Sequence, residues 1–164
     1  MGDFDVIYSP NVQLFRHGEP KGYEFLPSPI NVSIVAASAY IRPSTFLDKK
    51  TNQLRMGSKF EDGTKQKIRA MLRAALENGH DSMVLSAFGS GAYKNPANHV
   101  AELFHHVLTV EFNSQFKEVV FAILDNDYTV KNTGENSGEK KKSKDKQETS
   151  SVSSNFESYR KVFK

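Results

Sequence analysis

The pattern of hydrophobic and polar positions divides the first 125 residues into short apolar runs and two amphipathic stretches. The apolar runs predict strands, because branched and aromatic residues follow one another there without a helical period. Two of them, residues 6–8 and 12–15, predict short strands or one extended segment. Three longer runs, residues 31–39, 82–87 and 118–124, are typical of buried strands, and the first suits burial on both faces.

Two stretches between these runs have the spacing of amphipathic helices. The first starts near Thr64, its apolar residues recur at i, i+3, i+4, i+7 and i+8, and Gly79 supplies the left-handed residue that often ends a helix. The second begins at Pro96, which suits a first helical turn, and its core face includes Val100 and Phe104. Strand, helix, strand, helix, strand is the order of an α/β layer with a largely parallel sheet.

The composition changes after residue 130, which we expect to end an α/β body formed by residues 1–130. Residues 131–154 are rich in Lys, Ser, Glu, Gly and Thr and contain no aromatic residue. Such a segment cannot bury enough apolar area to offset its chain entropy, so we expect a disordered, low-complexity linker. Its lysine run is typical of a solvated linker, with a nuclear-import or acidic-partner patch as the alternative. Residues 155–164 then follow a helical spacing and are expected to dock on the body.

The charge distribution argues against direct nucleic-acid binding. The formal charge is +3, but residues 131–154 and 155–164 each contribute +2, which leaves a net charge of −1 for residues 1–130. Binding to a duplex depends on a basic excess that this body lacks. Residues 1–5 lack the basic flank of a secretory signal, and no apolar run has the length of a membrane span. We therefore expect no membrane contact and an intracellular location, either cytoplasmic or nuclear.

The residue types available restrict the chemistry of the chain. Cysteine is absent, which excludes disulfides, thiolate zinc sites and cysteine nucleophiles. His99 and His106 share a helix face but stand two turns apart, so we expect surface or helix-edge histidines and no metal site. Ser86 and Ser90 do not stand in the G-x-S-x-G pattern of a serine nucleophile. The adjacent carboxylates Glu61 and Asp62 precede a helix, where they suit its dipole. We expect no cofactor.

The segment that says most about possible ligand binding is the 88–95 loop. It joins the run at 82–87 to the helix that begins at Pro96. In an open α/β sheet, ligands collect beyond the carboxyl ends of strands, where a helix N-terminus offers N–H groups to an anion. Gly89 and Gly91 allow the backbone to approach such a ligand closely. On pattern alone, a tight strand-to-helix turn explains the loop equally well. Lys94 stands where the third glycine of a dinucleotide fingerprint would fall.

Residues 84–96, with the sequence VLSAFGSGAYKNP, resemble the signature of the microbial-type poly(ADP-ribose) glycohydrolases, roughly V-L-G-A-W/F-G-C-G-A-F-x-N-P-P. Residues 7–16, 36–37 and 116–123 agree with that family in the same order, so the resemblance covers most of residues 6–125 and corresponds to its C-terminal half. Ser86, Ser90 and Ala97 depart from the signature in size or rigidity. The resemblance implies a macrodomain-like, three-layer α/β/α fold whose N-terminal part is missing from this chain.

The resemblance also implies a site for ADP-ribose or poly(ADP-ribose). The ligand-binding residues that it implies lie in the loop and just after the last strand: Phe88, Gly89, Ser90, Gly91, Ala92, Tyr93, Asn95, Asp125 and Asn126. Tyr93 is expected to flank the distal ribose, and Asp125 and Asn126 the adenosine end, although a plain strand-terminating turn explains the last two equally well.

Catalysis is not expected from this chain alone. Members of the family carry a Gly-Gly-Gly run followed by adjacent glutamates, one of which is the acid/base, and the chain contains neither a Gly-Gly nor a Glu-Glu pair. We therefore expect an ADP-ribose binder without catalytic residues. Two alternatives stay open. One is a hydrolase completed by another chain or an upstream segment. The other is an interaction module with a vestigial nucleotide site, whose exposed sheet edge requires a protein partner.

Overall fold

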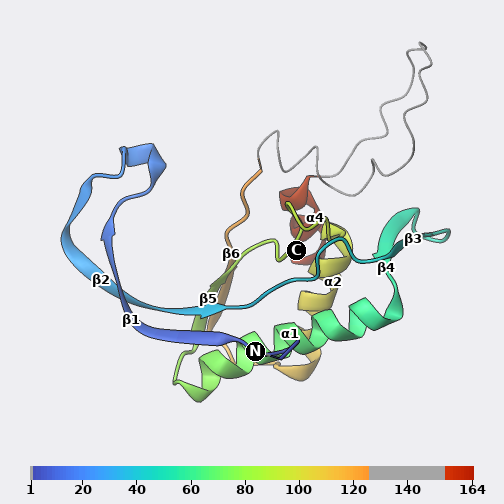
Figure 1. The fold of residues 1–164 in the computed structure, drawn as a ribbon, viewed down its shortest axis with the longest axis horizontal. Helices are drawn as coiled ribbons and strands as arrows, with labels where there is room; N and C mark the ends of the chain where they lie inside the picture. The colour runs from blue at the N-terminus through green and yellow to red at the C-terminus, as the bar shows by residue number, and fades with distance from the viewer. Residues whose placement is uncertain (1, 126–153) are drawn as a thin grey trace, which may run out of the picture.

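The computed structural model describes residues 2–125 and 154–164, which form a mixed α/β body with small sheets (Figure 1). The predicted linker therefore lies outside the described residues up to position 153. In chain order the elements are β1 (Ile7–Arg16), the 3-10 turn η1 (Glu19–Lys21), β2 (Phe25–Ala36), β3 (Thr45–Asp48), β4 (Gln53–Met56), α1 (Ser58–Glu77), β5 (Ser82–Leu85), α2 (Ala97–His106), the π-helical turn η2 (Val107–Glu111), β6 (Glu118–Phe121) and α4 (Asn155–Val162).

Strands β1 and β2 form a long antiparallel hairpin that arches away from the helices (Figure 1). The two short strands predicted near the N-terminus are one strand, whose register shifts between Ser9 and Val12, where Asn11 has a φ of 54°. Strand β2 begins at Phe25, earlier than expected, and most of its residues are exposed. The prediction that this run is buried on both faces is wrong, because only the face carrying Val35 packs against the core.

The parallel pairing predicted from the element order is found in β5 and β6, in the register Ser82 to Glu118 and Leu85 to Phe121. Helix α2 lies between them in the chain and provides the crossover that a parallel pair needs. The other two pairs, β1–β2 and β3–β4, are antiparallel hairpins. Parallel pairing is therefore a smaller part of the described strands than the sequence predicted. The β3–β4 hairpin was not predicted, since its turn is organised by polar contacts of Asp48 with Lys50 and Thr51 rather than by an apolar pattern.

Most buried residues of the hydrophobic core lie on helices α1 and α2. The predicted face of α1 is buried, with Ile68 and Leu72 both fully inaccessible, and Gly79 has a φ of 78° just after the helix, as expected. Helix α2 buries Val100 and Phe104 in the same cluster, which includes side chains from β5 and β6. In the ranges 2–125 and 154–164, no helix has the length and apolar character needed to cross a membrane.

Helix α4 packs on α2 (Figure 1). Its first turn is capped by Ser154, whose Oγ accepts a hydrogen bond from the amide of Glu157. Tyr159 is 2% exposed, and its ring centroid lies 6.4 Å from that of Phe104 and 5.0 Å from that of Phe121. The helix therefore closes one end of the core.

Candidate functional site

The 88–95 loop joins the end of β5 to the start of α2, so it lies beyond the carboxyl end of a parallel strand. Ser90 and Asn95 are buried in the loop, whereas Ala92 and Tyr93 are exposed. Phe88 is directed inward, with its ring edge-to-face against Phe104 at a centroid distance of 6.5 Å. The structure thus brings the predicted loop residues together, but the ring of Phe88 anchors the loop to α2 instead of facing the solvent.

Asn95 holds the loop in shape from within. Its Nδ2 lies within hydrogen-bond distance of three carbonyl oxygens, those of Tyr40 at 2.8 Å, Gly89 at 3.0 Å and Tyr93 at 3.4 Å. The amide of Arg42 donates to the same carbonyl of Tyr93 at 2.8 Å. These contacts join the loop to the segment after β2, a connection that the sequence pattern did not indicate, although the small residues at 36–39 precede it.

Gly89 is required by the geometry of this loop. Its φ is +72°, which L side chains rarely adopt, and an added Cβ would lie 2.5 Å from both the Cβ of Ala39 and Nδ2 of Asn95. Gly91 differs, because an added Cβ would meet no atom within 4 Å. One glycine therefore allows the close packing of the loop, and the other faces open space.

The backbone amides of the loop differ in their hydrogen-bond partners. The amides of Ser90 and Lys94 donate to Ala87 and Gly91. By contrast, the three consecutive amides at residues 91–93 donate to no acceptor within the described parts of the chain. Consecutive unpaired amides form a concave site for an anion. The buried Ser90 hydroxyl likewise has no hydrogen-bond partner among the residues described.

Of the two residues expected at the adenosine end, Asp125 is the one that the structure describes. Asp125 follows β6, and both of its carboxylate oxygens lie 3.3 Å from the amide of Phe156, at the start of α4. It therefore orients α4, a contact that favours the structural interpretation of this turn. Asn126 lies outside the described residues.

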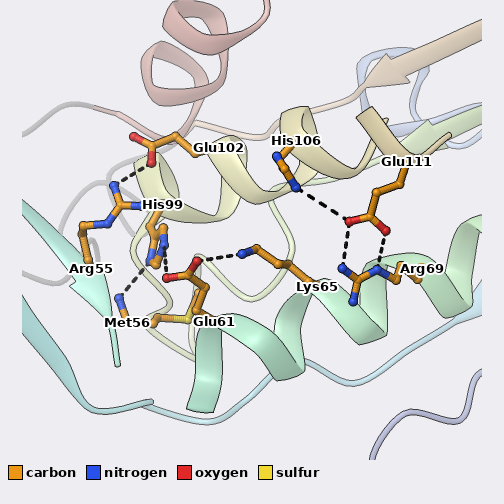
Figure 2. A network of polar contacts seen from close by, with 9 residues as sticks. All are labelled: Arg55, Met56, Glu61, Lys65, Arg69, His99, Glu102, His106 and Glu111. Carbon is orange, nitrogen blue, oxygen red and sulfur yellow. Dashed lines mark hydrogen bonds and ion pairs between the residues drawn. The ribbon is translucent and has the colours of Figure 1, made fainter. Parts of the chain in front are cut away.

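A network of polar side chains lies between α1, α2 and β4 (Figure 2). His99, in the first turn of α2, is 1% exposed, so the expectation of a surface or helix-edge histidine is wrong for this residue. Its Nδ1 accepts a hydrogen bond from the amide of Met56 at 2.9 Å, which places the proton on Nε2, 3.4 Å from the carboxylate of Glu61. Burial lowers the pKa of His99, the positive charge of Arg55 lowers it further, and the carboxylates of Glu61 and Glu102 partly oppose both effects.

Glu61 is held as a carboxylate by its neighbours. Burial acts to raise its pKa, but the hydrogen bond and charge of Lys65, 2.8 Å away, together with His99 and Arg55, bring the net pKa below its ordinary value. The rest of the network consists of contacts between elements (Figure 2): Arg55 with Glu102 at 2.6 Å, Arg69 with Glu111, and Nε2 of His106 with the carboxylate of Glu111 at 3.8 Å. Within the described residues, no three His, Asp or Glu side chains are grouped to hold a metal ion.

Solved structures similar to this chain are bacterial poly(ADP-ribose) glycohydrolases. The enzyme from Deinococcus radiodurans in complex with ADP-ribose matches 78% of this chain and 50% of its own length, with 27% identity and a TM-score of 0.63. The enzyme from Thermomonospora curvata matches 74% of this chain and 42% of its own length, with 30% identity and a TM-score of 0.62. No protein-family model and no curated protein match the chain.

These matches agree with the resemblance carried by the 88–95 loop and its flanking strands, and they extend it to the fold. The chain spans about half the length of the solved glycohydrolases. It is therefore related in sequence and in its macrodomain-like α/β fold to the bacterial poly(ADP-ribose) glycohydrolases.

Proposed function

We propose that the chain binds ADP-ribose through the 88–95 loop, with the diphosphate against the backbone at residues 89–92 and the distal ribose beside Tyr93. The observation that carries this proposal is the row of unpaired amides at residues 91–93, next to the open space at Gly91. Backbone amides can hold a diphosphate without lysines, which agrees with the net charge of −1 over residues 1–130. The relative from Deinococcus radiodurans was solved in complex with ADP-ribose, which supports this choice of ligand.

The internal support of the loop favours a preformed site. Asn95 fixes carbonyl groups of the loop, and Gly89 allows close packing against Ala39. A rigid row of donors loses little conformational entropy when a ligand binds. Asn95 is then a positioning residue, while the backbone at residues 89–92 and Tyr93 provide the ligand contacts.

We propose binding without cleavage by these 164 residues. A glycosidic acid needs a carboxyl group that is protonated at working pH, which requires a raised pKa. Glu61 belongs to the one pair of adjacent carboxylates in the chain, yet its pKa is lowered and its carboxylate is paired with Lys65. Glu61 is therefore not suited to the role of a glycosidic acid.

Calorimetric titration with ADP-ribose tests the proposal. Gly91→Glu places a negative side chain in the open space over the amides and is expected to abolish the binding heat. Ser28→Glu adds the same charge on the exposed part of β2 and is expected to bind like the unaltered chain. No heat with the unaltered chain, or equal binding by both variants, would contradict the proposal.

A separate assay tests the absence of cleavage. The chain is incubated with a poly(ADP-ribosyl)ated protein, and released ADP-ribose is measured by chromatography. We expect no release above the buffer control. Release that the loop variant Gly91→Glu abolishes would show that this chain carries a complete hydrolase site.

A further inference from the structure

Helix α4 is linked to the 88–95 loop by a cluster of aromatic side chains. The ring of Tyr159, on the buried face of α4, lies 6.4 Å from that of Phe104 on α2 and 5.0 Å from that of Phe121 on β6, between centroids. Phe104 in turn packs edge-to-face on Phe88, the first residue of the loop, at 6.5 Å. The helix and the loop therefore share one aromatic partner, Phe104.

The hydroxyl group of Tyr159 also lies near the backbone of the loop. Burial raises the pKa of Tyr159, and the amide of Phe88 partly opposes that effect. The two groups do not reach hydrogen-bond geometry, so this buried hydroxyl has no hydrogen-bond partner among the described residues. Oδ1 of Asn155, a 2% exposed residue at the start of α4, is unpaired in the same way. Buried polar atoms without partners oppose the burial of the surface that carries them, so both atoms weaken the docking of α4.

Helix α4 has eight residues, which is too short for a helix to persist in water without tertiary contacts. Two polar contacts hold its first turn. Oγ of Ser154 accepts from the amide of Glu157 at 3.1 Å, and the carboxylate of Asp125 lies 3.3 Å from the amide of Phe156. The formation of α4 and its docking are therefore one event, in which the cap and the ring contacts form or are lost together.

We propose that Tyr159 is a positioning residue for the 88–95 loop, and that the loop keeps its ligand-binding shape only while α4 is docked. When α4 separates from the body, Phe104 loses the ring of Tyr159, and the packing that fixes Phe88 at the start of the loop is weakened. The coupling is reciprocal, because a ligand that binds only the docked form must stabilise docking. The ligand part of this inference rests on the proposed binding of ADP-ribose, whereas the coupling itself is a property of the free chain.

Hydrogen exchange of the free 164-residue chain tests the coupling. Ser154→Ala removes the cap of α4 and touches no residue of the loop. It is expected to speed exchange about fivefold at the amide of Ser158, which donates to the first carbonyl of the helix. The amides of Ser90 and Asn95, which donate within the loop segment, should exchange faster by the same factor.

Ser154→Thr is the matched control, because it keeps the hydroxyl group that caps the helix. It is expected to leave exchange within about twofold of the unaltered chain at all of these amides. The amide of Gly22, in the turn of the hairpin that arches away from the helices (Figure 1), should exchange at the same rate in every variant. Faster exchange in α4 with no change in the loop would overturn the proposal.

ADP-ribose tests the reciprocal effect. At about one hundredfold above its Kd, it is expected to slow exchange at the amide of Ser158 by about tenfold or more, since it stabilises only the docked form. The Gly91→Glu variant should show no such change. Binding heat without protection of α4 would overturn this inference and leave the proposed function intact. Absence of binding heat would contradict the proposed function alone, because the comparison of Ser154→Ala with Ser154→Thr still decides whether α4 and the loop are coupled.

Discussion

The Cβ atom that Gly89 lacks would lie 2.5 Å from Nδ2 of Asn95, the atom that donates to the carbonyl of Gly89 itself at 3.0 Å. The absence of a side chain at one residue thus allows the hydrogen bond made by the other. The shape of the loop therefore depends on this pair.

Replacing the two loop glycines by alanine should have opposite effects on stability. Gly89→Ala forces a side chain into a left-handed conformation and into Ala39, and we expect a loss of about 2–4 kcal/mol in the free energy of unfolding. Gly91→Ala meets no atom and should leave stability unchanged or raise it by up to about 1 kcal/mol. Urea denaturation measures both values, and equal losses would show that the loop has a different shape.

Asn95→Asp should destabilise the loop while nearly preserving its volume. A carboxylate oxygen would replace the Nδ2 donor and face the carbonyl oxygens of Tyr40 and Gly89, so we expect a loss of about 1–3 kcal/mol. Asn98→Asp, in the first turn of α2, is the control, because a negative charge there suits the helix dipole. Thermal denaturation compares them, and a stable Asn95→Asp variant would refute the positioning role.

The sequence predicted the position of the loop but not the different structural roles of Gly89, Gly91 and Asn95. Glycine spacing and the flanking strand and helix were sufficient to locate the loop. The contacts of Asn95 with Tyr40 could not be predicted, because they join residues 55 positions apart through a backbone carbonyl, which leaves no mark in the pattern of side chains. Helix α1, by contrast, could be predicted because its buried residues from Ile68 to Ala75 are close in the sequence and recur with the period of a helix.

The exposure of β2 shows that apolar content alone does not predict the burial of a strand. The run in β2 is rich in branched residues, as a buried strand would be, yet Ile34 is 47% exposed. The composition of β2 is that of a strand buried on both faces, but the described residues cover only one of its faces. The hairpin β3–β4 was missed because it is short and its turn depends on Asp48, a polar signal that also occurs in irregular loops.

Helix α4 should contribute strongly to stability through one residue. Tyr159→Ala would leave a cavity beside Phe104 and Phe121, and we expect a loss of about 3–5 kcal/mol. Phe156→Ala is the control on the same helix, because its side chain is 47% exposed, and its effect should stay within about 0.5 kcal/mol. Calorimetric melting of both variants checks this, and a small effect of Tyr159→Ala would mean that α4 is not docked in solution.

The buried His99 should make stability depend on pH in a defined window. Its pKa in the folded chain lies below the ordinary value of 6.5, chiefly because of burial, so the unfolded chain takes up its proton first as the pH falls. Its contribution to stability is therefore complete above pH 6.5 and is lost progressively below it, until the pH reaches the lowered pKa of the folded state. His99→Asn keeps an acceptor near the Nδ1 position for the amide of Met56 but cannot titrate. Denaturation curves between pH 5 and about 7.5 should show a shallower loss of stability for the variant than for the unaltered chain, and parallel curves would mean that His99 is not the group responsible.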